Sequence, residues 1–226
     1  MSKLATYIQQ NKKPVIKENI EAPMVNVLVK GHLPRGVSFQ DVFDEVKEKI
    51  PKKLFSDIDS IIIGDFDFLN EKDLNSLYHD GKLYISNKKR SEDSILHDII
   101  HEIAHSIEHK YKDELYEDKI LQIEFINKRR KLFNQMSPFY PECHDFDFDS
   151  IQYSDKFDEF LYKTVTYPKL ARLSNGIFLS PYAATSLREY FADGFECYIL
   201  HPHLRRHLYM LCPTLYEKIR KIVDRK

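Results

Sequence analysis

Glycine and cysteine are both scarce in this chain of 226 residues. The six glycines are too few and too scattered to form a glycine-rich phosphate loop, which excludes the common binding motifs for ATP, GTP and NAD. The three cysteines include no C-x-x-C pair, so neither a disulfide framework nor a cysteine-based zinc site is expected. Reduced thiols of this kind are typical of a cytoplasmic protein.

Neither sign of charge dominates, because 34 basic residues stand against 35 acidic residues for a net charge of -1. The chain therefore has no large positive field to neutralise phosphates, and no nucleic-acid partner is expected. No run approaches the roughly 18 consecutive apolar residues of a membrane span, and the first residues lack the apolar core of a secretory signal. We expect no membrane span and, in the chain as given, a cytoplasmic location, with a secreted or injected effector as the alternative.

The apolar residues, 42% of the chain, suffice for one substantial core. Residues 1–24 are polar, lysine-rich and broken by proline, and we expect an arm there, before a single domain of residues 25–226. The runs at 25–29, 60–64 and 82–86 have the β-branching or alternation of strands, and residues 39–50 have helical spacing. This order predicts a small mixed sheet.

From Ser91 onward the pattern is helical. Apolar residues at a spacing of 3.6 predict a helix of about five turns. A second helix is expected at 113–135, an irregular segment at 136–150, and three further helices separated by Pro202 and Pro213. The predicted fold class is α+β, with a small mixed sheet packed on the first of these helices and a mainly helical C-terminal half.

The first of these helices carries the motif His101-Glu102-Ile103-Ala104-His105, which has the pattern H-E-x-x-H. Four residues on a helix bring two imidazoles to one face, so both can bind one metal, and Glu102 is rotated by about 100° toward a metal-bound water. Two imidazoles, a carboxylate and a water make a zinc site with one open position. The alternative is a solvated face of an ordinary helix.

An inverted motif overlaps the first one. His105-Ser106-Ile107-Glu108-His109 has the pattern H-x-x-E-H, which also belongs to zinc enzymes. The two motifs cannot both bind the same ion, and only a third ligand can decide between them. A further cluster, His201 to His207, has two arginines beside it and is expected to be a solvated helix end.

Glu189 is the best candidate for the third ligand. It stands three residues after Ser186, so a glutamate of a helix-capping box is the alternative role. Asp193 follows one turn later on the same face, where a carboxylate could orient a ligand imidazole. Tyr182, seven residues before Glu189, offers a phenol that could donate to an oxyanion.

These motifs together resemble the catalytic domain of anthrax lethal factor and the related Pro-Pro endopeptidases. The resemblance covers roughly residues 58–222 and rests on the H-E-x-x-H helix, on Tyr182, and on the segment Glu189-Tyr190-Phe191-Ala192-Asp193-Gly194-Phe195. It implies a zincin fold of the gluzincin type. One zinc ion per chain would be bound by His101, His105 and Glu189.

The resemblance also implies roles for the remaining residues. Glu102 would be the general base, Tyr182 the oxyanion donor, and Asp193 would replace a glutamate of lethal factor. Glu108 and His109 would have no role. An extended protein or peptide substrate would lie along an edge strand, here Leu83–Ser86 with Asn87.

The function expected from the sequence is therefore that of a zinc-dependent metalloendopeptidase, in which Glu102 activates a zinc-bound water to hydrolyse peptide bonds. Two alternatives remain open. One is a zinc-binding or toxin-associated interaction module of the same fold that hydrolyses nothing. The other is an intracellular processing enzyme with one dedicated substrate.

Overall fold

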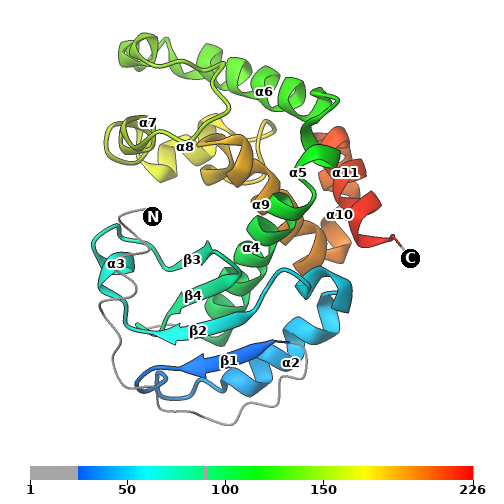
Figure 1. The fold of residues 1–226 in the computed structure, drawn as a ribbon. Coiled ribbons are helices and arrows are strands. Elements are labelled where there is room, and N and C mark those ends of the chain that lie inside the picture. The colour runs from blue at the N-terminus through cyan, green and yellow to red at the C-terminus, as the bar shows by residue number, and fades with distance from the viewer. Residues whose placement is uncertain (1–24, 89–90, 226) are drawn as a thin grey trace. The chain divides into compact units, whose positions relative to one another are not determined.

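The computed structural model describes residues 25–88 and 91–225, and the arm expected at residues 1–24 lies outside them. The chain divides into two compact units, residues 1–102 and residues 103–226. Helix α4 (Glu92–Lys110) continues through the boundary, so its first turns belong to one unit and its last turns to the other. As predicted, the fold is α+β, with a small mixed sheet and a mostly helical remainder (Figure 1).

The first unit is built on a four-stranded sheet. In spatial order its strands are β1 (Asn26–Val29), β2 (Ser60–Gly64), β4 (Lys82–Ser86) and β3 (Ser76–His79). The strands β1, β2 and β4 are parallel, whereas β3 is antiparallel to β4. The three parallel strands are those that the sequence predicts.

The strand β3 is not among the predicted strands, and it corrects the expected edge of the sheet. Asp80 and Gly81 have φ values of 46° and 73°, as a two-residue type I′ turn requires, and this turn joins β3 to β4. The strand β4 consequently lies between β2 and β3. The expectation that Leu83–Asn87 forms an edge is therefore wrong, because both sides of β4 are already paired and leave no free ladder for a substrate.

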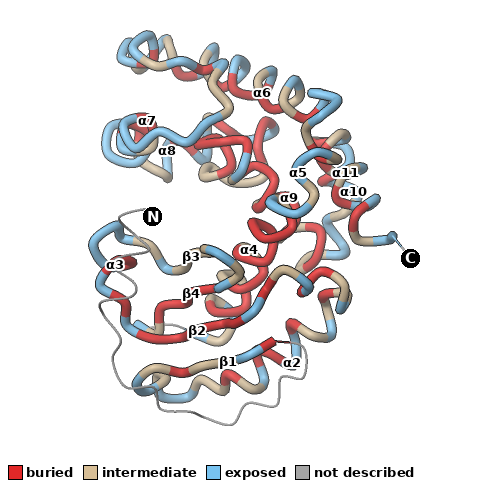
Figure 2. Tube along the Cα trace, viewed as in Figure 1, coloured by how far each residue is buried: buried red, intermediate tan, exposed pale blue. Residues whose placement is uncertain are grey.

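The central strands β2 and β4 are buried along most of their length (Figure 2), and side chains on both of their faces are buried. On one face the side chains of Ile61, Ile63, Leu83 and Ile85 are fully buried. On the other face, Ile62 and Tyr84 pack in a cluster with Phe66, Phe68 and Leu69. The last two of these belong to the short helix α3 (Asp67–Asn70). A strand buried on both faces explains the continuous run of isoleucines in β2.

The two longest helices of the first unit lie where the sequence predicts them. Ser38 caps α2 (Phe39–Lys49) by accepting a hydrogen bond from the Asp41 amide at 3.3 Å. A short turn, η1 (Lys52–Phe55), follows Pro51. The buried stripe of α4 consists of Ile95, Ile99, Ile100, Ile103, Ala104 and Ile107. Burial of this stripe confirms the predicted amphipathic helix.

The described part of the second unit is helical. Its α-helices are α5 (Lys112–Tyr116), α6 (Ile120–Met136), α7 (Asp155–Glu159), α8 (Tyr167–Leu173), α9 (Leu187–Leu200), α10 (Arg205–Leu211) and α11 (Pro213–Val223). Its other helical segments are the π-helix η3 (Phe160–Val165) and the 3-10 turns η2 (Pro141–Asp145), η4 (Tyr182–Ala184) and η5 (Pro202–Leu204). The breaks near Pro202 and Pro213 confirm the three predicted C-terminal helices. The single helix expected at 113–135 is wrong, because Lys119 at φ 59° separates α5 from α6.

The helix α9 is packed tightly within the second unit. A Cβ atom at Gly194 would collide with the Leu215 side chain of α11, so only glycine permits this approach of the two helices. On another side of α9, the Tyr190 hydroxyl donates to Glu124 of α6 at 2.8 Å. These contacts hold the start of α9, where Glu189 lies, in a defined place.

None of the helices in residues 25–88 and 91–225 has the length and apolarity needed to cross a lipid bilayer.

Candidate metal centre

Two imidazoles lie on one face of α4. His101 and His105 are four residues apart on a continuous helix, so helix geometry alone places them one turn apart on the same side. The side chain of His105 is only 6% exposed. The isoleucine stripe on the buried side of the helix fixes the backbone from which both imidazoles project.

Glu189 brings a carboxylate to these imidazoles from α9. Ser186 caps this helix by accepting the Glu189 amide at 3.2 Å, so the predicted serine cap is present. The Glu189 carboxylate lies 3.6 Å from Nε2 of His105, and its side chain is only 12% exposed. A helix-capping role does not require this glutamate to lie beside an imidazole, so its position favours the ligand role.

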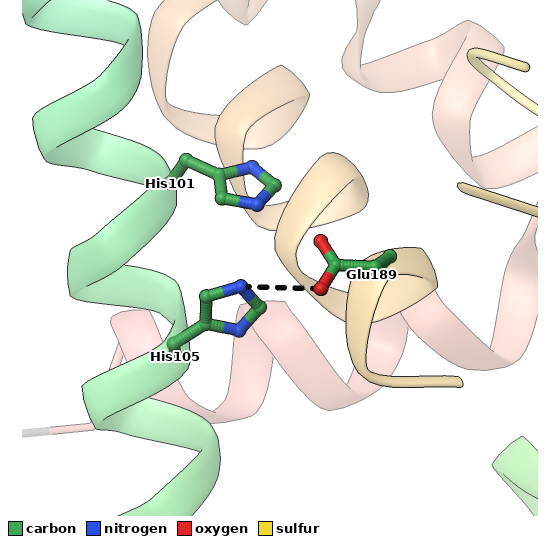
Figure 3. Close-up of side chains that lie close together, drawn as sticks. All are labelled: His101, His105 and Glu189. Carbon is green, nitrogen blue, oxygen red and sulfur yellow. Dashed lines mark ion pairs between the residues drawn. The ribbon is translucent and has the colours of Figure 1, made fainter. Parts of the chain in front are cut away.

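His101, His105 and Glu189 together could hold a metal ion. Their ligand atoms all lie within 4.8 Å of one another, and the three side chains converge on one point (Figure 3). Ligand atoms about 2.0–2.1 Å from a tetrahedral zinc are about 3.3 Å apart, so small side-chain movements would suffice to bind the ion. Among the described residues this is the one such group of three, and it includes His101 rather than the exposed His109.

Glu102 is held by the edge strand of the first unit. Its carboxylate accepts hydrogen bonds from the Ser76 hydroxyl at 2.7 Å and from the Tyr78 amide at 2.6 Å. The residue is only 4% exposed. An ionised carboxylate can accept about four hydrogen bonds, so each oxygen keeps a lone pair for a water. The sequence could not predict these two partners, because they belong to the strand that it did not reveal.

Tyr182 begins the turn η4, just before α9, and its ring is partly buried. Burial and, next, the negative charge of Glu189 raise the pKa of the Tyr182 hydroxyl far above its ordinary value. The hydroxyl therefore remains a hydrogen-bond donor at any physiological pH.

The negative charge of Glu189 also helps to raise the pKa of two further tyrosine hydroxyls. Tyr153 donates a hydrogen bond to Asp158 at 2.9 Å, and burial followed by that bond raises the pKa of its hydroxyl. Burial raises the pKa of Tyr167 to about 12, with smaller contributions from Asp158 and Glu189. Neither residue was predicted as a site residue, because no motif or spacing distinguishes them from the other tyrosines.

Glu108 has a defined place behind His105. It accepts a hydrogen bond from the Tyr116 hydroxyl at 2.7 Å and lies 3.4 Å from the Arg188 guanidinium. Arg188 in turn donates to Nδ1 of His105 at 3.0 Å. The resemblance assigned Glu108 no role, but in the structure it adjoins a candidate ligand.

The remaining predicted residues lie on α9 or directly after it. Asp193 lies on α9 one turn after Glu189, where its charge, after burial, helps raise the pKa of Cys197 to about 11. Its contact with a ligand imidazole stays a prediction. His201 and His203 contact each other at a ring distance of 5.8 Å, but the metal-competent group found among the described residues does not include them.

Comparisons of the chain with protein-family models, with curated proteins and with solved structures found no match. Function must therefore be inferred from the residues and their geometry.

Proposed function

We propose that this chain is a zinc-dependent endopeptidase with a gluzincin-type site, similar to that of the lethal factor catalytic domain. The observation that supports the proposal is the convergence of His101, His105 and Glu189 within 4.8 Å. Two neutral imidazoles and one carboxylate are a donor set that zinc takes in hydrolytic sites with an open fourth position. These residues would hold one zinc ion per chain.

The bound zinc would polarise the scissile carbonyl and lower the pKa of a water molecule beside it. Glu102 takes the proton from this water and then delivers it to the leaving amine. The two hydrogen bonds from β3 keep the Glu102 carboxylate in one orientation, so it needs no rearrangement before the proton is transferred. The Tyr182 hydroxyl donates a hydrogen bond to the oxyanion that develops on the carbonyl oxygen.

The substrate is proposed to be a protein or peptide in extended form. The strand β3, not β4, is at the edge of the sheet; its Tyr78 amide is already bound to Glu102, so the remaining outward backbone groups of the strand would pair with such a chain. The Glu102 carboxylate binds the Tyr78 amide on this strand at 2.6 Å. A peptide added along β3 would therefore run close to the general base.

The test combines cleavage with metal analysis. The zinc-loaded protein is incubated with a combinatorial peptide library, and the new termini are sequenced by mass spectrometry. We expect cleavage at a defined set of bonds, and no cleavage after a chelator has removed the metal. Replacing any one ligand, as in Glu189→Ala, should abolish stoichiometric zinc binding, because two protein ligands leave the site incomplete.

Two results would contradict this proposal in different ways. A Glu189→Ala protein that keeps stoichiometric zinc would remove Glu189 from the ligand set and return attention to the inverted motif. A parent protein that binds zinc but cleaves no library peptide would favour a non-hydrolytic zinc-binding module.

A further inference from the structure

A second group of polar side chains lies on the opposite side of the His105 ring from Glu189. The group comprises Glu108 of α4, Tyr116 of α5 and Arg188 of α9, all within the second unit. Arg188 Nε lies 3.0 Å from His105 Nδ1, and Glu108 Oε2 lies 3.9 Å from the same nitrogen. The resemblance noted in the sequence gives none of these three residues a function.

The hydrogen bonds in this group determine which ring nitrogen of His105 carries the proton. Arg188 is always a donor, so its bond to Nδ1 makes that nitrogen an acceptor. A neutral His105 then carries its proton on Nε2, where the Glu189 carboxylate lies 3.6 Å away. In this tautomer the Nε2 lone pair is not available to a metal.

Metal binding requires the opposite tautomer. When Nε2 of His105 donates its lone pair to an ion, the ring proton moves to Nδ1 and would then face the N–H of Arg188. Two donors cannot share a hydrogen bond, so Nδ1 needs an acceptor instead. Glu108 Oε2 is an acceptor within reach, since it lies 3.9 Å from Nδ1 and only 3.4 Å from Arg188 Nε.

We propose that Glu108 is a positioning residue for the metal ligand His105. In the metal-bound protein its carboxylate accepts a hydrogen bond from the Nδ1–H group of His105. The Arg188 guanidinium then no longer donates to the imidazole and pairs with Glu108 instead. This inference rests on the proposed function, because it requires an ion at Nε2. Carboxylates that hold a ligand imidazole in this way fix its tautomer and orientation and increase its basicity.

The surroundings of Glu108 suit this role. Its side chain is only 16% exposed, and Tyr116 holds the second carboxylate oxygen at 2.7 Å. Burial and the negative charge of Glu108 raise the pKa of Tyr116, so that its hydroxyl stays a donor. One oxygen of Glu108 is thus fixed by Tyr116, and the other can accept a hydrogen bond from either Arg188 or His105.

The decisive measurement is zinc affinity, determined by competition with a chromophoric chelator. Loss of a residue that orients a metal ligand typically weakens binding 10-fold to 100-fold, and we expect this for Glu108→Gln. Tyr116→Phe removes only the anchor of Glu108 and should weaken zinc binding by less, about threefold to tenfold. It also provides a second variant if Glu108→Gln folds poorly.

Glu92→Gln is the matched control. Glu92 is a glutamate of the same helix, α4, and it accepts a hydrogen bond from the Ser38 amide at 2.6 Å. Its replacement should lower the thermal midpoint without changing zinc affinity, because it lies more than two turns before His101. Equal losses of zinc affinity in Glu92→Gln and Glu108→Gln would show that Glu108 acts only through stability, which would overturn the inference.

A spectroscopic test examines the proton itself. In the Co²⁺-substituted protein, the exchangeable N–H of a ligand imidazole gives a paramagnetically shifted proton resonance. We expect the His105 resonance to exchange slowly with solvent in the parent and faster in Glu108→Gln, because its acceptor is weakened. If the parent binds neither zinc nor cobalt, the proposed function fails and this inference fails with it. If the parent binds zinc but Glu108→Gln matches its affinity and exchange rate, the metal site stands and the role of Glu108 is wrong.

Discussion

Glu102 and Glu108 lie on the same helix and each accepts a hydrogen bond from a hydroxyl, but their other partners differ. Glu102 belongs to the first unit, and its partners are a hydroxyl and a backbone amide of the strand β3. Glu108 belongs to the second unit, and its partners are the Tyr116 hydroxyl and the Arg188 guanidinium. Two residues of one type on one helix thus have different partners, which suit the different roles proposed for them.

The difference bears on the choice between the two overlapping motifs. A guanidinium beside Glu108 already compensates its negative charge, which suits a carboxylate that orients another group. The partners of Glu102 are a neutral hydroxyl and a neutral amide, so no cation beside it opposes the approach of a proton. In the inverted motif the second imidazole would be His109, which is exposed and lies outside the metal-competent group. The surroundings therefore favour Glu102 as the general base.

The largest expected effect comes from exchanging each glutamate for its amide at saturating zinc. Glu102→Gln should lower kcat about 10²-fold to 10⁴-fold, because an amide cannot accept the proton. Glu108→Gln should stay within about threefold of the parent once the site is filled, because its role ends with holding His105. Cleavage of a peptide taken from the library screen measures both.

Glu102→Gln should keep its fold and its zinc. The amide oxygen can accept the Tyr78 amide, and the Ser76 hydroxyl can rotate to accept from the new NH₂ group. If Glu108→Gln were the inactive protein and Glu102→Gln the active one, the comparison would be reversed and the active motif would be His105 to His109.

A smaller effect is expected from replacing Tyr182, which tests whether the second unit contributes a group to the chemistry in addition to the ligands His105 and Glu189. Tyr182→Phe should lower kcat about 10²-fold to 10³-fold with little change in KM or in zinc content, because only the transition state needs the hydroxyl. Steady-state kinetics on the same peptide measures this.

Tyr153→Phe is the matched control for Tyr182. Its side chain is more exposed than that of Tyr182, and its hydroxyl donates to Asp158, so its loss should change kcat by less than about threefold. The comparison requires equal thermal midpoints in both variants. A Tyr182→Phe protein with the parent rate would leave the chemistry to Glu102 and the zinc, and would assign Tyr182 a structural role.

The smallest effect is expected at Ser76, which tests what the strand contributes to Glu102. Ser76→Ala removes one of two hydrogen bonds to the carboxylate, and kcat should fall about fivefold to tenfold while zinc affinity is unchanged. Ser76→Thr keeps a hydroxyl on a side chain that suits a strand, and it should restore the rate. Equal rates in Ser76→Ala and the parent would show that the Tyr78 amide alone orients Glu102.

Much of the fold was predictable because its signals are local. The isoleucine run of β2 and the apolar stripe of α4 are periodic patterns, and Ser38 and Ser186 mark helix starts by their own hydrogen bonds. The strand β3 escaped detection because four residues of intermediate burial carry no clear alternation. The break at Lys119 escaped because a left-handed lysine is indistinguishable in sequence from a helical one.

By itself, the sequence determined the part of the candidate site that helix geometry controls. The spacing of His101 and His105 places two imidazoles on one face wherever the helix lies. Tertiary structure alone decided that Glu189, far along the chain, comes within 3.6 Å of His105. Tertiary structure also decided that Glu102 meets a strand whereas Glu108 meets an arginine. Helical spacing is a property of neighbouring residues, but the partners of a carboxylate depend on how distant segments pack, and no short pattern encodes that.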